Sequence, residues 1–176
     1  TEAAIIFSTD LTEFIKEDQS YLYVDVGGGS TEFTVFSKGK IINAKSFKLG
    51  TVRLLNQTVN KKELWKSIEK WIKSNTKGLK RIPLIGSGGN INRIYKMSGK
   101  APGKTLSYIY LNAHYKFLKQ MSYDERITEL GLNPDRADVI IPATKIYLNA
   151  MKWSDANKIM VPKIGLADGI IKTLYQ

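Results

Sequence analysis

Asp25–Glu32 reads Asp-Val-Gly-Gly-Gly-Ser-Thr-Glu, and the residues on either side of it decide the fold. Before the glycines, residues 21–26 are rich in aromatic and β-branched side chains, which favour strands. After them, residues 31–36 alternate apolar and polar side chains with the period of two of a strand. Lys38 and Gly39 then favour a tight turn into residues 40–47. We predict three sequential antiparallel strands whose first turn is the glycine run.

Helical and strand patterns alternate in the rest of the chain. Apolar residues at helical spacing predict an amphipathic helix over 61–75. A short strand is predicted over 81–85, where Pro83 favours a sheet edge or the start of the strand. Ser122 and Glu125 have the spacing of a capping box. The other predicted elements are helices over 50–59, 90–97, 107–119, 122–130, 135–152 and 165–174 and a strand over 158–161. This order indicates an α/β domain, with a mixed sheet and helices packed around it.

Composition narrows the class of protein. The 176 residues are enough for one ordinary domain, and 43% hydrophobic with 24% charged residues is typical of a globular chain. The absence of cysteine excludes disulfides, thiolate zinc sites and a cysteine nucleophile. No apolar run approaches the roughly 18 residues of a membrane helix, so no membrane partner is expected. The chain begins at Thr1 without a basic, apolar leader, which predicts a cytoplasmic protein.

The net charge of +11 is concentrated in one part of the sequence. Residues 70–123 contain eleven lysines and arginines and no carboxylate, and the other sixteen basic residues balance the sixteen acidic ones. A continuous basic third predicts a surface that attracts polyanions. A lysine-rich solvated surface without a partner explains the same pattern equally well.

The first glycine loop has the composition of an anion cradle. Successive glycines at a strand end allow the backbone to bend closely around a ligand with its N–H groups directed inward. Asp25 and Glu32 flank the turn, and such carboxylates hold Mg²⁺ directly or through water. A hairpin turn without a ligand is the alternative, although it requires fewer glycines. The predicted phosphate-binding residues are Gly27, Gly28, Gly29, Ser30 and Thr31.

A second glycine loop lies between a predicted strand and a predicted helix. The N-terminus of a helix favours anions, so Gly86, Ser87, Gly88 and Gly89 form a second candidate phosphate cradle, with a plain tight turn as the alternative. Neither loop fits the dinucleotide-binding fingerprint, since Glu32 and Ile91 occupy the position of its last glycine. The Walker Gly-Lys-Ser/Thr sequence is absent from the chain. Two cradles and a basic third together imply a substrate with several phosphates.

These motifs resemble those of the exopolyphosphatase / guanosine pentaphosphate phosphohydrolase family, in the actin-like, ribonuclease H-like ATPase and phosphatase superfamily. Asp25–Glu32 is similar to the family signature Asp-Ile-Gly-Gly-Gly-Ser-Thr-Glu over its whole length, and Gly86–Gly89 to the second phosphate loop of the family. Residues 1–7, 49–54, 136–140, 142 and 165–169 are similar to further family segments. The resemblance implies that residues 1–176 are a single domain with a ribonuclease H-like fold. By the same resemblance, that domain would be the second, C-terminal lobe of a two-lobed enzyme, with the first lobe absent from this chain.

The resemblance also implies a reaction. The enzyme would hydrolyse terminal phosphoanhydride bonds of inorganic polyphosphate, of guanosine pentaphosphate or of both, with Mg²⁺ held by Asp25 and Glu32. Glu2 matches the general base of the family, although its position near the chain end would by itself predict a solvated glutamate. Arg93 and other cations of the basic third would guide the polyanionic substrate. The isolated lobe is expected to be inactive or nearly so without its missing N-terminal lobe.

Other functions stay open at this point. A kinase of the same superfamily uses similar loops to hold ATP, and a sensor would bind polyphosphate or guanosine tetraphosphate without turnover. A homodimer also stays open. Nucleic-acid binding is not expected, because glycine–carboxylate loops give it no support.

Overall fold

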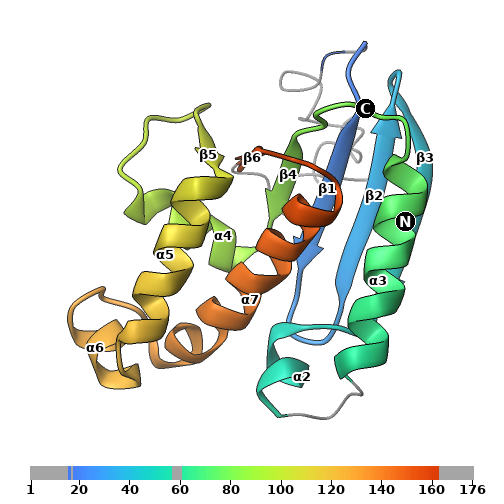
Figure 1. The fold of residues 1–176 in the computed structure, drawn as a ribbon. Helices are drawn as coiled ribbons and strands as arrows, with labels where there is room; N and C mark the ends of the chain where they lie inside the picture. The colour runs from blue at the N-terminus through green and yellow to red at the C-terminus, as the bar shows by residue number, and fades with distance from the viewer. Residues whose placement is uncertain (1–15, 17, 57–60, 163–176) are drawn as a thin grey trace, which may run out of the picture.

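The computed structural model describes residues 16, 18–56 and 61–162, and they form a six-stranded mixed sheet with helices (Figure 1). The strands run in the order β3-β2-β1-β4-β6-β5 across the sheet. Their bounds are β1 Tyr21–Val26, β2 Thr31–Ser37, β3 Lys40–Phe47, β4 Leu84–Ser87, β5 Thr105–Ser107 and β6 Lys158–Met160. The helices are α2 Thr51–Leu55, α3 Lys61–Thr76, α4 Gly89–Met97, α5 Tyr108–Gln120, α6 Tyr123–Thr128 and α7 Pro134–Trp153.

The first three strands form the predicted antiparallel meander. β1 pairs with β2, and β2 pairs with β3. Lys38 and Gly39 join the last two strands with φ angles of 52° and 70°, the positive values that a tight hairpin turn of this hand requires. The sequence prediction of this unit is therefore confirmed.

The sheet places its core on the side of the helices. Alternate residues of β1, namely Leu22, Val24 and Val26, face a large apolar cluster contributed by α3, α4, α5 and α7, which lie over this face in Figure 1. The opposite face of β1 carries Tyr21 and Tyr23 in a smaller cluster. Asp25 follows the same alternation, so it belongs to this second face, at the carboxyl end of the strand.

Parallel pairing brings two loops to one edge of the sheet. β4 runs parallel to β1 and β6 runs parallel to β4, so all three strands end at the same edge. The glycine loop after β1 and the glycine loop after β4 are therefore neighbours, although about sixty residues separate them in the sequence. This edge is where ligands bind in open α/β sheets.

The position of β4 decides between the two alternatives for Pro83. β4 lies inside the sheet between β1 and β6, so the edge position is wrong and the position at the start of the strand is confirmed. Pro83 stands just before the strand, and its carbonyl accepts a hydrogen bond from the Leu22 N–H at 3.2 Å. The three-residue strand β5 was not predicted, because so short a segment carries no readable periodicity.

The helix predictions agree with the observed elements to within a few residues. The capping box at the start of α6 is present: the Ser122 hydroxyl accepts from the Glu125 N–H, and the Glu125 carboxylate accepts from the Ser122 N–H. The predicted helix over 50–59 corresponds to the five-residue α2. The predicted helix over 165–174 lies outside the described residues.

Candidate functional site

The glycine loop after β1 is held on one side by α2. The Thr51 N–H donates to the carbonyl of the first glycine of Gly27–Gly29 at 3.0 Å. The Val52 N–H donates to the second carbonyl at 3.0 Å. The Arg53 Nε donates to the third carbonyl at 2.7 Å. Three successive carbonyls of the loop therefore point toward the beginning of α2.

These three hydrogen bonds, here called the clamp by α2, determine where the N–H groups of the loop point. Across a trans peptide bond the N–H points opposite to the preceding carbonyl, and the described residues contain no cis peptide. The amides of Gly28, Gly29 and Ser30 are consequently directed away from α2. Gly28 and Gly29 are exposed, and their amides have no backbone partner among the described residues. The amide of Gly27 instead closes the loop by donating to the Ser30 carbonyl at 3.0 Å.

Gly50 permits this close approach of α2. A Cβ atom at Gly50 would overlap the Gly28 carbonyl and lie 2.5 Å from the Gly29 nitrogen. The φ angle of Gly50 is −127°, which any residue can adopt, so the requirement for glycine here is one of space. Together, α2 and Gly50 form a rigid support behind the exposed amides.

Two carboxylates and a serine form a row beside the loop. Asp25 lies directly opposite Glu32 in the β1–β2 ladder and is in register with Ser87 of the parallel β4. Residues opposite each other in neighbouring strands present their side chains on the same face. Asp25 and Glu32 are half-buried. The predicted pairing of the two carboxylates is thus consistent with the register.

The row has the donor chemistry of a magnesium site. Mg²⁺ is usually held by one or two carboxylates and takes its other ligands from water and substrate phosphates. Asp25 and Glu32 supply two such carboxylates next to outward-facing amides. Among the described residues there is no cluster of three or more histidines, aspartates or glutamates that could hold a metal ion.

The second glycine loop lies against the first. Gly88 has a φ angle of +117°, a value that strongly favours glycine, and it precedes the first residue of α4. A Cβ atom at Gly88 would lie 3.0 Å from the Val26 carbonyl and 3.6 Å from Asp25 Oδ1. Gly86 is required by packing, since its Cβ would lie 2.6 Å from Ile159 Cδ1. The structure therefore brings Asp25 and Gly88 together.

Tyr147 of α7 reaches this junction from the core side of the sheet. Its hydroxyl donates to the Ser87 carbonyl and would lie 3.3 Å from a Cβ at Gly88. Burial raises the pKa of the Tyr147 phenol well above its ordinary value, and the nearby Asp25 charge raises this pKa further. The hydroxyl therefore stays protonated at neutral pH and is available as a donor.

Arg136 is a site residue that sequence reasoning did not assign. A Cβ atom at Gly89 would lie 2.7 Å from Arg136 Nη1 and 2.8 Å from Nη2, so the guanidinium lies against the N-terminus of α4. Arg136 lines a groove of about 710 Å³ together with Arg93, Lys96 and Lys100. No carboxylate is among the described residues that line it. The signal available in the sequence was the similarity of residues 136–140 to a family segment.

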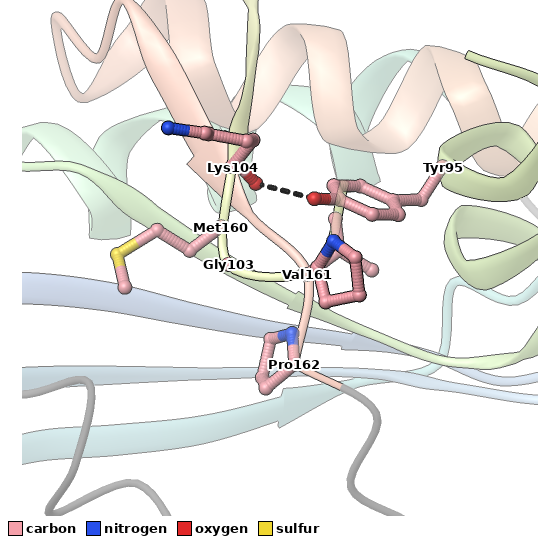
Figure 2. Close-up of a pocket in the computed structure, with 7 residues that line it drawn as sticks. Tyr95, Gly103, Lys104, Met160, Val161 and Pro162 are labelled. Atoms are coloured by element: carbon pink, nitrogen blue, oxygen red, sulfur yellow. Dashed lines mark hydrogen bonds between the residues drawn. The ribbon is translucent and has the colours of Figure 1, made fainter. Parts of the chain in front are cut away.

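A smaller cavity of about 140 Å³ adjoins this groove (Figure 2). Tyr95 lines both spaces, and its hydroxyl lies within hydrogen-bond distance of the Ala101 carbonyl at 2.7 Å and of the Lys104 carbonyl at 2.8 Å, either of which can accept its single proton. Met160, Val161 and two prolines contribute to the cavity wall. The wall is mostly apolar, and we assign no ligand to the cavity.

Some predicted ligands have partners inside the protein. The Thr31 hydroxyl is buried and donates to the Leu49 carbonyl at 2.5 Å. The Arg93 Nη2 donates to the Leu130 and Gly131 carbonyls at 2.6 and 3.1 Å, although this side chain also lines the groove. Roles for Thr31 and Arg93 in binding phosphate stay predictions. Glu2 lies outside the described residues.

Comparison with known proteins places the chain in a family. The model of the Ppx/GppA phosphatase family matches residues 1–176. The chain belongs to this family. An exopolyphosphatase from Cytophaga hutchinsonii is 26% identical with a TM-score of 0.81, over 98% of this chain and 62% of that one. The Ppx/GppA family member of Aquifex aeolicus is 22% identical with a TM-score of 0.77, over 99% of this chain and 61% of that one.

One curated relative matches this chain over only part of its own length. The bifunctional 3-dehydroquinate synthase/phosphatase of Fusobacterium nucleatum is 28% identical over 91% of this chain, which spans 27% of that protein. The chain thus spans about three fifths of the solved Ppx/GppA chains and about a quarter of this relative. In the part of the chain that the structure describes, no helix has the length and apolarity needed to cross a bilayer.

Proposed function

We propose that this Ppx/GppA chain is the second lobe of a two-lobed hydrolase that removes the terminal phosphate from inorganic polyphosphate or guanosine pentaphosphate. The observation that carries the proposal is the orientation of the first glycine loop. Its carbonyls are fixed by α2, so the amides of Gly28, Gly29 and Ser30 are free to bind an oxyanion beside Asp25 and Glu32. Such preorganised donors stabilise the charge that develops in phosphoryl transfer.

The carboxylate row supports a role in metal binding. Asp25 and Glu32 would hold Mg²⁺, which neutralises charge on the terminal phosphate when it is bound. The amides of Gly28 and Gly29 would contact the oxygens of the phosphoryl group that is transferred. Water then displaces the shortened chain, and the anhydride bond to the terminal phosphorus breaks. From the family resemblance, Glu2 would accept the proton of that water.

The second loop supports binding of the remaining phosphates. The N-terminus of α4 at Gly89 carries the partial positive charge of a helix dipole, and the Arg136 guanidinium lies against it. Lys96 and Lys100 continue the positive charge along the groove. A groove lined by cations and no described carboxylate favours a chain of phosphates, and its attraction should decrease steeply with added salt.

The proposal is tested by phosphate release from polyphosphate and from guanosine pentaphosphate by the full-length protein with Mg²⁺. We expect release of inorganic phosphate that stops on chelation and is restored by added Mg²⁺. Glu2→Gln should abolish it. ADP formation from ATP with a sugar acceptor would instead indicate a kinase, and binding of polyphosphate without turnover would indicate a sensor; either result contradicts the proposal.

Arg136→Ala is expected to raise the KM for polyphosphate about tenfold, because a charge-assisted contact with phosphate contributes roughly 1.5 kcal/mol. Lys152→Ala, which removes an exposed cation in the last turn of the same helix α7, is the matched control and should leave KM within twofold. Steady-state kinetics at low and at physiological salt measure the KM of both variants. Equal KM values for the two variants would remove Arg136 from the binding site.

A further inference from the structure

The two glycine loops come from different parts of the chain, yet a substrate that contacts both requires a fixed distance between them. The β1–β4 ladder ends at Asp25 and Ser87, and Gly88 has already left the sheet. Beyond that point no strand pairing holds the second loop to the first. Another contact is needed to define the position of Gly88 relative to Asp25.

Tyr147 supplies a contact of this kind. Its side chain is completely buried in the core, and its hydroxyl donates to the Ser87 carbonyl, the last peptide of β4. The same hydroxyl lies next to Gly88, and the Asp25 carboxylate is close enough to act on the phenol electrostatically. One buried group therefore contacts the second loop and adjoins the carboxylate beside the first.

Gly88 lies next to both of these groups. A Cβ atom there would be 3.3 Å from the Tyr147 hydroxyl, a tight contact, and 3.6 Å from Asp25 Oδ1, an ordinary van der Waals contact. The hydroxyl and the carboxylate are thus both packed near the backbone of the second loop. A close-packed arrangement of this kind transmits small displacements, because its members cannot adjust independently.

We propose that Tyr147 is a positioning residue, whose hydroxyl fixes the second glycine loop relative to Asp25 and so aligns the phosphates held by the two loops. The proposal rests on the proposed function for its effect on turnover. Tyr147 contacts neither substrate nor metal; it acts through the Ser87 carbonyl and through its packing against Gly88 and Asp25. Groups that orient metal ligands in this way commonly change affinity or activity by 10–100-fold when removed.

The test compares Tyr147→Phe with Thr144→Val in the full-length protein. Both variants remove one buried hydroxyl from α7; that of Thr144 bonds only to the Ile140 carbonyl of the same helix. We expect the two variants to have similar melting temperatures. Tyr147→Phe should bind Mn²⁺ with pyrophosphate about tenfold more weakly, as measured by calorimetry, and its kcat for polyphosphate should decrease about tenfold. Thr144→Val should stay within twofold of the wild type in both the affinity for Mn²⁺ with pyrophosphate and the kcat.

A second measurement keeps this inference separate from the proposed function. Amide hydrogen exchange of the segment 86–92 does not depend on catalysis, and we expect it to be about tenfold faster in Tyr147→Phe than in Thr144→Val. Unchanged exchange in this segment overturns the role of Tyr147, and so does equal Mn²⁺–pyrophosphate binding by the two variants when the wild type binds this pair. Absence of phosphate release by the wild type, with the exchange difference present, overturns the proposed function and leaves the positioning role in place.

Discussion

Asparagine at position 25 is expected to lower phosphate release by the full-length protein about a thousandfold. The substitution Asp25→Asn keeps the size of the side chain but removes the negative charge that would hold Mg²⁺, and such a charge contributes about 4 kcal/mol to a metal-dependent transition state. Asp25 is paired across the hairpin with Glu32, which would retain only part of the metal affinity. Phosphate release as a function of Mg²⁺ concentration measures the effect.

The control for this prediction is Asp124→Asn, which removes an exposed carboxylate in the first turn of α6. It should leave turnover within twofold. Asp25→Asn should also lose Mn²⁺ binding while its circular dichroism spectrum is retained. A variant that turns over normally at all Mg²⁺ concentrations would show that Asp25 holds no catalytic metal.

The second large effect is expected from Gly50→Ala. The added methyl group cannot be accommodated without moving the glycine loop, because the Gly28 carbonyl and the Gly29 nitrogen occupy its position. Overpacking of this kind costs about 1–3 kcal/mol of stability. Displacement of the loop amides by about 1 Å should reduce kcat about a hundredfold. Thermal unfolding and steady-state kinetics measure the two effects separately.

Gly78→Ala is the matched control for loss of stability alone. Gly78 follows α3 with a φ angle of +82° and has open space around it, so alanine there costs roughly 1 kcal/mol of backbone strain far from the site. It should lower the melting temperature and leave kcat unchanged. If Gly50→Ala and Gly78→Ala lose activity equally, the loss reflects instability and the clamp by α2 has no part in catalysis.

Local sequence patterns were sufficient to predict most of the helices and strands, but they said less about how the strands are arranged in the sheet. The alternation in residues 31–36 and the helical spacing in residues 61–75 predicted β2 and α3, because each period matches the geometry of its element, although β2 is buried on both faces over residues 33–36. The position of β4 inside the sheet depends on pairing with β1 and β6, which no local pattern encodes. Pro83 favoured an edge or the start of the strand, and it lies just before the first paired residue, where it costs no ladder bond.

The candidate site was predictable where its residues are adjacent in sequence. Asp25–Glu32 carries two carboxylates and a glycine turn in one motif, so their proximity follows from the hairpin. Gly50 and Tyr147 act on the two glycine loops from 18 or more residues beyond Glu32, through contacts that exist only after folding. Arg136 belonged to a recognisable family segment, but its place against Gly89 required the packing of α7 on α4.

The register of the first hairpin restricts how its turn can change during evolution. Side chains alternate between the two faces of a strand, so an insertion or deletion between Val26 and Thr31 that slips the pairing by one residue would turn Glu32 to the side opposite Asp25. Phe33 and Val35 would leave the core in the same step. A change of length by one therefore keeps the paired carboxylates only where the loop itself absorbs the residue, or where a bulge restores the register, and a changed loop must also rebuild the contacts of its carbonyls with α2.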